Sequence, residues 1–181
     1  MTPRTRSRIV LLLIAMVFFG SFGVAAWLRF SGWTPAGSTN YGTLLSPPVD
    51  VRAIAIRNAD GSAYAWQAPT HPWRIVVFAP PRCGAPCVEL SQALERVWRT
   101  EGRHANRVQV LWFGELPEAA ARFRNLLAMR DEPALRAAIA DQSAAGVLPV
   151  YLIDPNGFVA MRYDSGFDAA GLRRDLGRLL K

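Results

Sequence analysis

The chain has few of the residues from which most catalytic and metal-binding sites are built. It contains two cysteines and two histidines in 181 residues. No glycine-rich phosphate loop, no His-x-x-x-His zinc pattern and no serine, histidine and aspartate arrangement stands out. Internal repeats and low-complexity tracts are also missing from the sequence. These absences argue against nucleotide-dependent, zinc-dependent and serine-nucleophile chemistry, and they leave the cysteine pair as the main candidate for function.

Acidic residues are outnumbered by basic ones. There are 14 aspartates and glutamates against 21 lysines and arginines, which gives a formal net charge of +7. The arginines are scattered along predicted helices, at Arg96, Arg99, Arg103, Arg122, Arg124, Arg173, Arg174 and Arg178. Without a nucleic-acid-binding motif, we expect no nucleic-acid partner. A solvated surface is the simplest interpretation, and attraction to anionic lipid headgroups or to an acidic partner is the alternative.

An uncharged apolar run near the N-terminus predicts a transmembrane helix. The run extends from Ile9 to Leu28, which is about the length of a helix that crosses a bilayer. A cleaved signal peptide is the competing interpretation, because Gly23–Ala25 is rich in small residues. The length of the run and the interface aromatics Trp27 and Phe30 favour an uncleaved anchor.

The charges on the two sides of this run predict its orientation. Three arginines precede it, at positions 4, 6 and 8, and one, Arg29, follows it. By the positive-inside rule the N-terminus stays in the cytoplasm. We therefore expect a cytoplasmic segment over residues 1–8, an anchor over residues 9–29 and the remaining chain outside. In a bacterium this is the inner membrane with a periplasmic domain.

Residues 30–50 read as a periplasmic linker. Glycine and proline occur there at Gly32, Pro35, Gly37, Gly42, Pro47 and Pro48, with serine, threonine and asparagine between them. Such a composition suits a tether that lifts a folded part away from the membrane. Apolar residues indicate that part of the segment packs on the domain: Trp33, Tyr41, Leu44 and Leu45. We expect one folded domain over residues 51–181, a normal single-domain size.

A strand, a turn with both cysteines and a helix follow one another near the middle of the chain. Arg74–Ala79 is a short apolar run rich in β-branched residues, which predicts a strand buried on both faces. Pro80 and Pro81 end it, because neither proline can donate a hydrogen bond to a sheet. A helix is then predicted from about Val88 to Gly102. The apolar residues at helical spacing are Leu90, Leu94, Val97 and Trp98.

The start of this helix is where we infer chemistry. Cys83 lies at or just before the first turn, and Cys87 lies on the same face as Leu90. Unpaired backbone N–H groups and the positive end of the helix dipole favour a thiolate there. Arg82 adds a neighbouring positive charge. We therefore expect Cys83 to be the exposed attacking thiol and Cys87 to be its shielded partner.

A static disulfide is the alternative interpretation of the pair. Cysteines in an oxidising compartment do pair. A bond that closes so short a loop removes little entropy from the unfolded chain, so it stabilises the fold little. It also lies at a helix start instead of joining distant elements. A pair with a chemical function is therefore favoured.

The other elements predict a mixed sheet with flanking helices. The expected elements are a hairpin over 52–57 and 63–66 around Asn58–Gly61, a strand over 107–113, a helix from Pro117 to about Arg130, a second helix from 131–133 with Leu135 and Ile139 inward, a strand over 147–153, a turn over 154–157, a strand over 158–163 and a final helix capped by Asp168. The fold class is α/β, with one transmembrane helix before it.

These elements and motifs resemble the thioredoxin fold, in which two cysteines open a helix and a proline precedes a late strand. Three residues separate the cysteines here, where most thioredoxin-like oxidoreductases have two. Cys83-x-x-x-Cys87 followed by Tyr151–Gly157 resembles the SCO/SenC family. Ser31–Gly42 is similar to the start of small SCO-related membrane proteins linked with oxidase biogenesis in proteobacteria. The resemblance implies a membrane-anchored, copper-binding assembly factor for cytochrome c oxidase.

One ligand of that family is missing from the pattern. SCO proteins bind copper through both cysteines and a histidine, and alignment on Tyr151 places the histidine position at about Gly146. We expect His71 and His104 at surface positions distant from the cysteines. The two thiolates alone can hold Cu(I) but serve Cu(II) poorly. Met161 can supply a thioether, although core packing is its expected role.

Pro149 is the third predicted site residue. Thioredoxin-like enzymes carry a cis-proline before this strand, facing the cysteines, and Leu148-Pro149 lies at about that place. The resemblance therefore implies a cis bond and a site for thiol–disulfide exchange. The sequence alone allows either isomer, with trans the usual one. A proline that merely enters a strand is the alternative.

Three functions are compatible with these patterns. The first is a thiol–disulfide oxidoreductase that reduces the copper-site cysteines of an oxidase subunit. The second is a Cu(I) carrier that uses Cys83 and Cys87 as its ligands. The third is a scaffold without catalysis, which binds the oxidase or another assembly factor.

Overall fold

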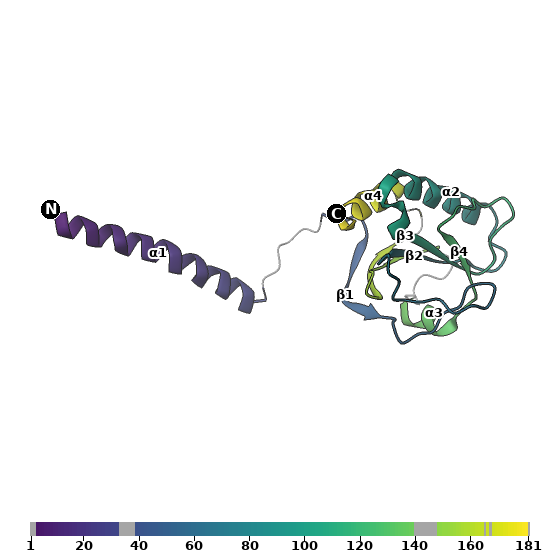
Figure 1. Cartoon of the computed structure of the whole chain (residues 1–181), viewed down its shortest axis with the longest axis horizontal. Coiled ribbons are helices and arrows are strands. Elements are labelled where there is room, and N and C mark those ends of the chain that lie inside the picture. The colour runs from purple at the N-terminus through teal and green to yellow at the C-terminus, as the bar shows by residue number, and fades with distance from the viewer. Residues whose placement is uncertain (1–2, 33–38, 140–147, 165, 167, 181) are drawn as a thin grey trace. The chain divides into compact units, whose positions relative to one another are not determined.

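The computed structural model of the chain describes residues 3–32, 39–139, 148–164, 166 and 168–180 (Figure 1). It divides into two compact units, Met1–Thr39 and Asn40–Lys181. The first contains the helix α1 (Pro3–Phe30). The second is an α/β domain and carries both cysteines.

The helix α1 has the length and composition of a membrane-spanning segment. Ser7–Phe30 is 24 residues long and apolar enough to cross a bilayer. Its large apolar side chains, such as Val17 and Phe19, are exposed. A helix that is apolar on all sides is stable when lipid or protein covers it. These features suggest a membrane anchor, as the run Ile9–Leu28 predicted.

The domain is built on one mixed sheet of six strands. In chain order these are β1 (Thr43–Asp50), β2 (Trp73–Phe78), β3 (Val108–Phe113), β4 (Leu126–Met129), β5 (Val150–Ile153) and β6 (Phe158–Tyr163). Their order across the sheet is β1-β6-β5-β2-β3-β4. The strands β2, β3 and β4 are parallel, whereas β5, β6 and β1 join by antiparallel pairing. The predicted fold class is therefore confirmed.

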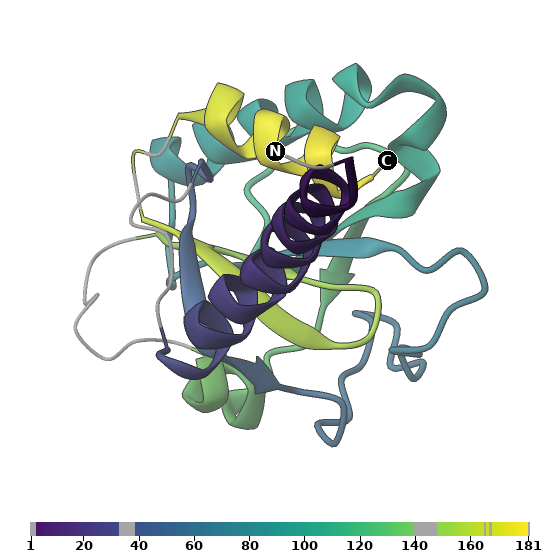
Figure 2. The ribbon, with the colours of Figure 1, turned by 90° about the vertical axis from the view of Figure 1, so that its left-hand side faces the viewer.

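Helices cover both faces of this sheet. The helices α2 (Ala85–Thr100) and α4 (Ala169–Leu179) lie together on one face, and α3 (Pro133–Ile139) lies on the other (Figures 1 and 2). A short 3-10 helix, η1 (Gly102–Arg107), connects α2 to β3. The layers form because the central strands alternate between two buried clusters. Ile75 and Val77 enter the first, with α2 and α4, and Val76 enters the second, with α3.

The helices α2 and α4 follow their predicted patterns. Leu94 and Val97 of α2 and Leu172 and Leu176 of α4 are buried in the first cluster. Helical spacing places these residues on one stripe of each helix. The Asp168 carboxylate accepts a hydrogen bond from the Ala170 N–H at 2.9 Å and caps α4.

The helix predicted over Pro117–Arg130 is wrong. Residues 117–125 form short turns separated by irregular segments, and β4 follows as a strand parallel to β3. The Asn125 side chain donates hydrogen bonds to the carbonyls of Ala105 and Val108, at 3.0 and 2.8 Å. These bonds direct the chain into the sheet. Pairing with β3 therefore outweighs the helical spacing of the apolar residues.

The hairpin predicted around Asn58–Gly61 is present only as a turn with a single bridge, Arg57 to Ala63. The segment on either side is irregular because buried side chains hold it. Arg74 of β2 is fully buried and donates to the Tyr64 hydroxyl at 2.8 Å and to the Trp66 carbonyl. The guanidinium thus provides a partner for the Trp66 carbonyl, a backbone group that a strand ladder would otherwise pair.

The linker predicted over residues 30–50 ends earlier than expected. The compact unit begins at Asn40, and β1 pairs antiparallel with β6 at the sheet edge. The register shifts between Leu44 and Val49, where two prolines lie. Prolines are tolerated there because the outer side of an edge strand pairs with no neighbour. Leu45 packs on the second cluster as expected, and Trp33 is outside the described residues.

A buried carboxylate fixes the start of the domain. Oδ2 of Asp175 in α4 accepts hydrogen bonds from the Tyr41 N–H, the Gly42 N–H and the Tyr163 hydroxyl, at 2.9, 3.0 and 2.9 Å. Burial and the bond to Asp175 raise the pKa of Tyr163 well above its usual range. A Cβ on Gly171 would lie 2.8 Å from the Tyr41 Cβ. We call these five residues the clasp, because they bind residues 41–42 to α4.

Candidate functional site

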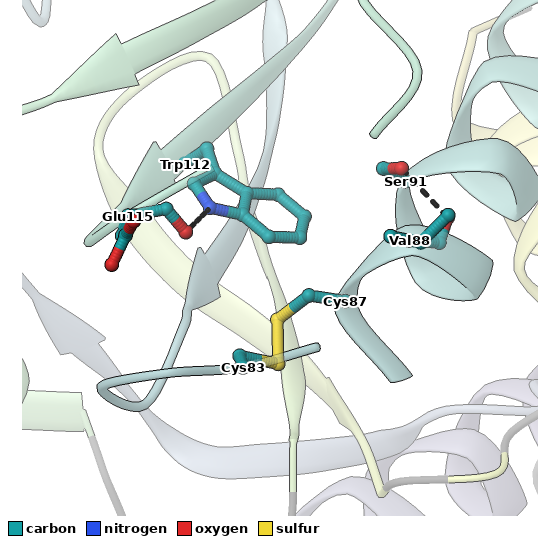
Figure 3. The surroundings of a disulfide bond; sticks show 6 residues. All are labelled: Cys83, Cys87, Val88, Ser91, Trp112 and Glu115. Atoms are coloured by element: carbon teal, nitrogen blue, oxygen red, sulfur yellow. Dashed lines mark hydrogen bonds between the residues drawn. A yellow bond between two sulfur atoms is a disulfide. The ribbon is translucent and has the colours of Figure 1, made fainter. Parts of the chain in front are cut away.

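A disulfide between Cys83 and Cys87 lies between the end of β2 and the first turn of α2 (Figure 3). The two Cα atoms are 5.6 Å apart. Cys83 is partly exposed and packs against the first cluster, whereas Cys87 is fully buried in it. The exposures agree with the prediction of an outer and an inner sulfur. The chemical roles of the two sulfurs stay a prediction.

The loop before the disulfide follows from its prolines. The Ala79 N–H donates to the Phe113 carbonyl at 2.8 Å and ends the pairing of β2 with β3. Pro80 and Pro81 cannot extend that pairing. Arg82 then adopts a φ of 57°, in the left-handed region. Backbone in this region is unfavourable for a residue with a side chain, and such positions cluster at functional sites.

The first turn of α2 provides a positive electrostatic environment for Cys83. The Gly84 carbonyl accepts from the N–H groups of Cys87 and Val88, at 3.2 and 3.3 Å. No acidic residue lies in this first turn, and Arg82 is exposed beside the disulfide. The helix dipole and the guanidinium both favour a negatively charged sulfur. The prediction that Cys83 is the attacking thiol in the reduced protein depends on these features.

Trp112 of β3 belongs to the surroundings of the disulfide (Figure 3). The indole is fully buried in the cluster that contains Cys87, and its Nε1–H donates to the Glu115 carbonyl at 3.3 Å. On α2, the buried Ser91 hydroxyl donates to the Val88 carbonyl and accepts from the Ala121 N–H. These buried groups form the inner side of the site, and their polar atoms have hydrogen-bond partners. The sequence does not single out Trp112 as a site residue. Its pattern is that of any buried strand residue, and only the fold places it near the cysteines.

A groove of about 400 Å³ lies along α2 and begins at Pro86, the residue before Cys87 in the chain. Its walls come from α2 between Pro86 and Arg96, from the start of α4 and from Leu148. The lining residues are Pro86, Glu89, Leu90, Ala93, Arg96, Leu148, Gly166 and Ala169. The lining is mostly apolar with two charged residues, which is the usual composition of a ligand-binding concavity. The sequence alone does not reveal this groove, because its two helices are far apart along the chain.

Pro149 is buried directly before β5, next to the groove residue Leu148. Among the described residues the cis peptide bond is Ser46-Pro47, so the Leu148-Pro149 bond is trans. The cis bond that the resemblance implied at this position is therefore wrong. Pro149 lies directly before the strand, as the alternative interpretation predicted. Its peptide bond is the trans isomer, which is the usual one for an X-Pro bond.

The remaining candidate ligands do not join the cysteines. Within the described ranges, no group of three or more histidine, cysteine, aspartate or glutamate side chains is placed to hold a metal ion. His71 precedes β2 and His104 precedes β3, whereas the disulfide follows the opposite end of β2. Met161 is buried in the first cluster, in contact with the Tyr163 hydroxyl at 3.5 Å. Gly146, the position aligned with the missing histidine, is outside the described residues.

The comparisons with known proteins support the fold. A family model described as a transmembrane-like, thioredoxin-like C-terminal domain matches residues 73–181. No curated protein matches the chain.

Solved structures of Sco proteins superpose on most of the chain. Apo Sco1 from Thermus thermophilus is 21% identical, with a TM-score of 0.56 over 80% of this chain and 99% of that one. BsSco, described as a Sco-family cytochrome c oxidase assembly protein with a disulfide switch, is 12% identical, with a TM-score of 0.53 over 74% and 95%. Copper-bound ScoI from Arabidopsis thaliana is 13% identical, with a TM-score of 0.51 over 72% and 94%. The resemblance to SCO/SenC proteins is thus confirmed for the fold.

Proposed function

The chain belongs to the family of transmembrane-like, thioredoxin-like C-terminal domains, and from this membership we propose that it is a membrane-anchored thiol–disulfide exchange protein. Its clients are the copper-site cysteines of a cytochrome c oxidase subunit. The observation that carries the proposal is the asymmetric pair at the start of α2, with Cys83 partly exposed and Cys87 fully buried. An exchange protein needs one sulfur open to a client and one protected from it.

The thiol–disulfide exchange proceeds in two steps. In the reduced protein the Cys83 thiolate attacks a client disulfide, forms a mixed disulfide and releases one client sulfur as a thiolate. The Cys87 thiolate then attacks Cys83 and releases the second client sulfur. The client gains two electrons and the pair returns to the disulfide. A dithiol donor must supply two electrons to restore the reduced pair.

The oxidase as client rests on the structural relatives. BsSco, with the same fold, is described as a member of a family of cytochrome c oxidase assembly proteins. The helix α1, the arginines before it and the fold together support a location of the domain outside the bacterial inner membrane. In that compartment the copper-site cysteines of an oxidase become oxidised and need reduction before they can bind metal.

Cu(I) carriage is the second candidate, and the donor atoms of the pair favour it. When reduced, Cys83 and Cys87 offer two soft sulfurs, which suit Cu(I). The described residues add no histidine or carboxylate to this pair, so the donor set fits Cu(I) and not Cu(II). Copper-bound ScoI shows that the fold accepts the metal in a relative. Here copper would be cargo passed to the oxidase.

The test uses the reduced full-length protein in detergent with a peptide disulfide that spans the copper-site cysteines of an oxidase subunit. We expect the peptide to be reduced and the protein to be oxidised in a 1:1 ratio. Cys83→Ser should slow the reaction at least about 100-fold, because the attacking sulfur is gone. Cys87→Ser should stop at the mixed disulfide.

A Cu(I) titration against a competing chelator separates the candidates. Peptide reduction without copper binding supports exchange alone, and tight 1:1 copper binding without reduction supports the carrier. Failure of both reactions overturns the proposal and leaves a scaffold that binds an oxidase subunit or another assembly factor.

A further inference from the structure

Arg82, the residue before Cys83, has a backbone conformation that its side chain makes unfavourable. Its φ is 57°, in the left-handed region, where a Cβ crowds the following carbonyl oxygen. Glycine has no Cβ and adopts this conformation without that cost. At the other described positions with positive φ the chain has glycine, with His71 as the exception. The chain therefore carries an arginine where glycine would be the easier residue for the fold.

The fold makes no use of the Arg82 guanidinium. The residue is exposed, and within the described part of the chain no hydrogen bond, ion pair or ring contact joins its side chain to another residue. Other arginines differ, because Arg99 and Arg136 pair with carboxylates at 2.7 and 2.8 Å. The first turn of α2 also contains no acidic residue. The charge of Arg82 is thus available to a group outside the described domain.

The turn that carries this arginine is held at both ends. The two residues before it are prolines, whose φ is fixed, and the residue after it is the disulfide-bonded Cys83. At the start of the turn, the loop after β3 packs closely on the backbone. Gly114 has a φ of 100°, and a Cβ there would lie 2.7 Å from the Ala79 carbonyl oxygen. The backbone therefore presents the arginine directly beside the partly exposed sulfur.

A client disulfide that reacts with Cys83 comes within reach of this side chain. In a disulfide the two Cα atoms lie about 4.4–6.8 Å apart. The client residues on either side of the reacting cysteine are one Cα step of about 3.8 Å farther along its chain. Arginine has a long side chain, is always charged and forms paired hydrogen bonds with a carboxylate. A carboxylate next to the client cysteine is therefore the group that suits Arg82 during exchange.

We propose that Arg82 is a specificity-determining residue, which favours client disulfides with an aspartate or glutamate beside the attacked cysteine. The inference rests on the proposed exchange through Cys83. An ion pair between exposed charges contributes at most a factor of about 5. Arg82 thus selects among clients by rate and does not decide whether exchange occurs. A lysine or arginine at the same place in a client is repelled.

This role differs from an effect of Arg82 on the reactivity of Cys83. A positive charge that favours the thiolate changes the rate of exchange with every disulfide in the same proportion. A positive charge that binds a carboxylate speeds exchange with acidic clients and slows exchange with basic ones. The ratio of the rate constants for matched acidic and basic substrates therefore measures recognition alone.

The test uses the full-length Cys87→Ser protein in an uncharged detergent, in which Cys83 is the remaining thiol. Two short peptides serve as substrates and differ only in a glutamate or a lysine beside a cysteine. This cysteine is joined by a disulfide to an aromatic thiol that is coloured when released. Attack by the Cys83 thiolate forms a mixed disulfide with the peptide and releases the aromatic thiolate. Because such a disulfide reacts with any accessible thiolate, the assay does not require reduction of an oxidase subunit.

We expect the glutamate peptide to react faster than the lysine peptide on the order of 10-fold at low salt. In 1 M salt, where the Debye length is about 3 Å, the ratio should approach one. Arg82→Gln should also bring the ratio close to one, and Arg82→Lys should retain a preference because it keeps the charge. Arg82→Glu should reverse the order of the two peptides.

Arg124→Glu is the matched control, because it changes the net charge by the same amount as Arg82→Glu. Arg124 is exposed and precedes β4. The strands β2, β3 and β4 are parallel, so the start of β4 lies at the opposite end of the sheet from the disulfide, which follows the end of β2. This variant should keep the ratio of the native protein. If Cys87→Ser fails to fold, the reduced native protein gives the same ratio from the first release of the aromatic thiolate.

Two results would overturn the proposal. The first is equal rates for the two peptides at low salt. The second is a preference that survives in Arg82→Glu or is lost in Arg124→Glu, because it would then depend on other charges. Arg82→Gly should lose the preference without loss of stability in urea unfolding, and a marked loss would instead assign the arginine to the fold. A reversed preference in Arg82→Glu, without reduction of the oxidase peptide, would refute the proposed function alone.

Discussion

Replacing Asp175 by alanine removes the acceptor that joins the start of the domain to α4. Three donors lose their partner, the N–H groups of Tyr41 and Gly42 and the Tyr163 hydroxyl. Arg178, whose guanidinium lies 3.6 Å from the other carboxylate oxygen, loses an ion-pair partner. A buried donor without a partner costs about 1–3 kcal/mol. Water can enter the space left by the carboxylate and satisfy part of this loss. We therefore expect Asp175→Ala to lower the free energy of unfolding by about 3–5 kcal/mol.

Asp175→Asn is a more conservative substitution at the same position, because it keeps an acceptor oxygen and removes only the charge. Its side-chain oxygen can occupy the place of Oδ2, which accepts all three bonds. The loss is then the difference between a charged and a neutral acceptor, about 1–2 kcal/mol. Asp164→Ala is the matched control, because this carboxylate is 65% exposed and pairs with Arg162 at the surface. A surface ion pair contributes at most about 1 kcal/mol.

The assay is urea unfolding of the full-length protein in detergent, followed by tryptophan fluorescence. The midpoint and slope give the free energy of unfolding for each variant. The expected order of stability is native protein, Asp164→Ala, Asp175→Asn and Asp175→Ala. The reasoning is refuted if Asp175→Ala is no less stable than Asp164→Ala, because the clasp would then contribute nothing.

Three further predictions concern other parts of the domain. In the reduced protein, iodoacetamide should modify Cys83 at least about 10-fold faster than its buried partner, as peptide mass spectrometry will show; equal rates would contradict the assigned order. Gly171→Ala should lower the free energy of unfolding by about 1–3 kcal/mol in urea unfolding, because the new Cβ would lie 2.8 Å from the Tyr41 Cβ of the clasp. Gly177→Ala is the control on the same helix and should not destabilise the domain, because its Cβ meets open space. Hydrogen bonds from Arg52 lower the pKa of Asp50 from 3.8 to about 2, so the small stabilisation from this pair is present above pH 3.8 and disappears as the pH falls through about 2; an NMR titration midpoint near 3.8 would exclude the pair.

The part of the site that the sequence predicted is the part that local signals determine. A β-branched run, two prolines and a helical stripe specify β2, the turn and α2 without knowledge of the rest of the chain. The positions of Cys83 and Cys87 relative to the helix start follow from this local pattern. Their difference in exposure also follows, because Cys87 lies on the stripe with the buried Leu94.

The errors occur where distant segments decide the structure. Leu126 and Leu127 have the spacing of a helix, but β3 offers them a parallel partner, and the sequence does not show that pairing. The strand β1 contains two prolines and its partner β6 lies more than 100 residues later. From the sequence alone, Asp175 resembles an exposed acidic residue of an amphipathic helix. Only the fold places Tyr41 beside it. The groove along α2 likewise needs α2 and α4 together.

The measurement that tests the central claim most directly is the trapping of a mixed disulfide in native membranes. Cells that produce the full-length Cys87→Ser variant are quenched with acid, alkylated and separated without reductant. The account predicts a reductant-sensitive adduct through Cys83 that contains an oxidase subunit, and no such adduct in the Cys83→Ser variant. Adducts of equal yield in both variants, or none in either, would contradict the assignment of Cys83 as the exchanging sulfur.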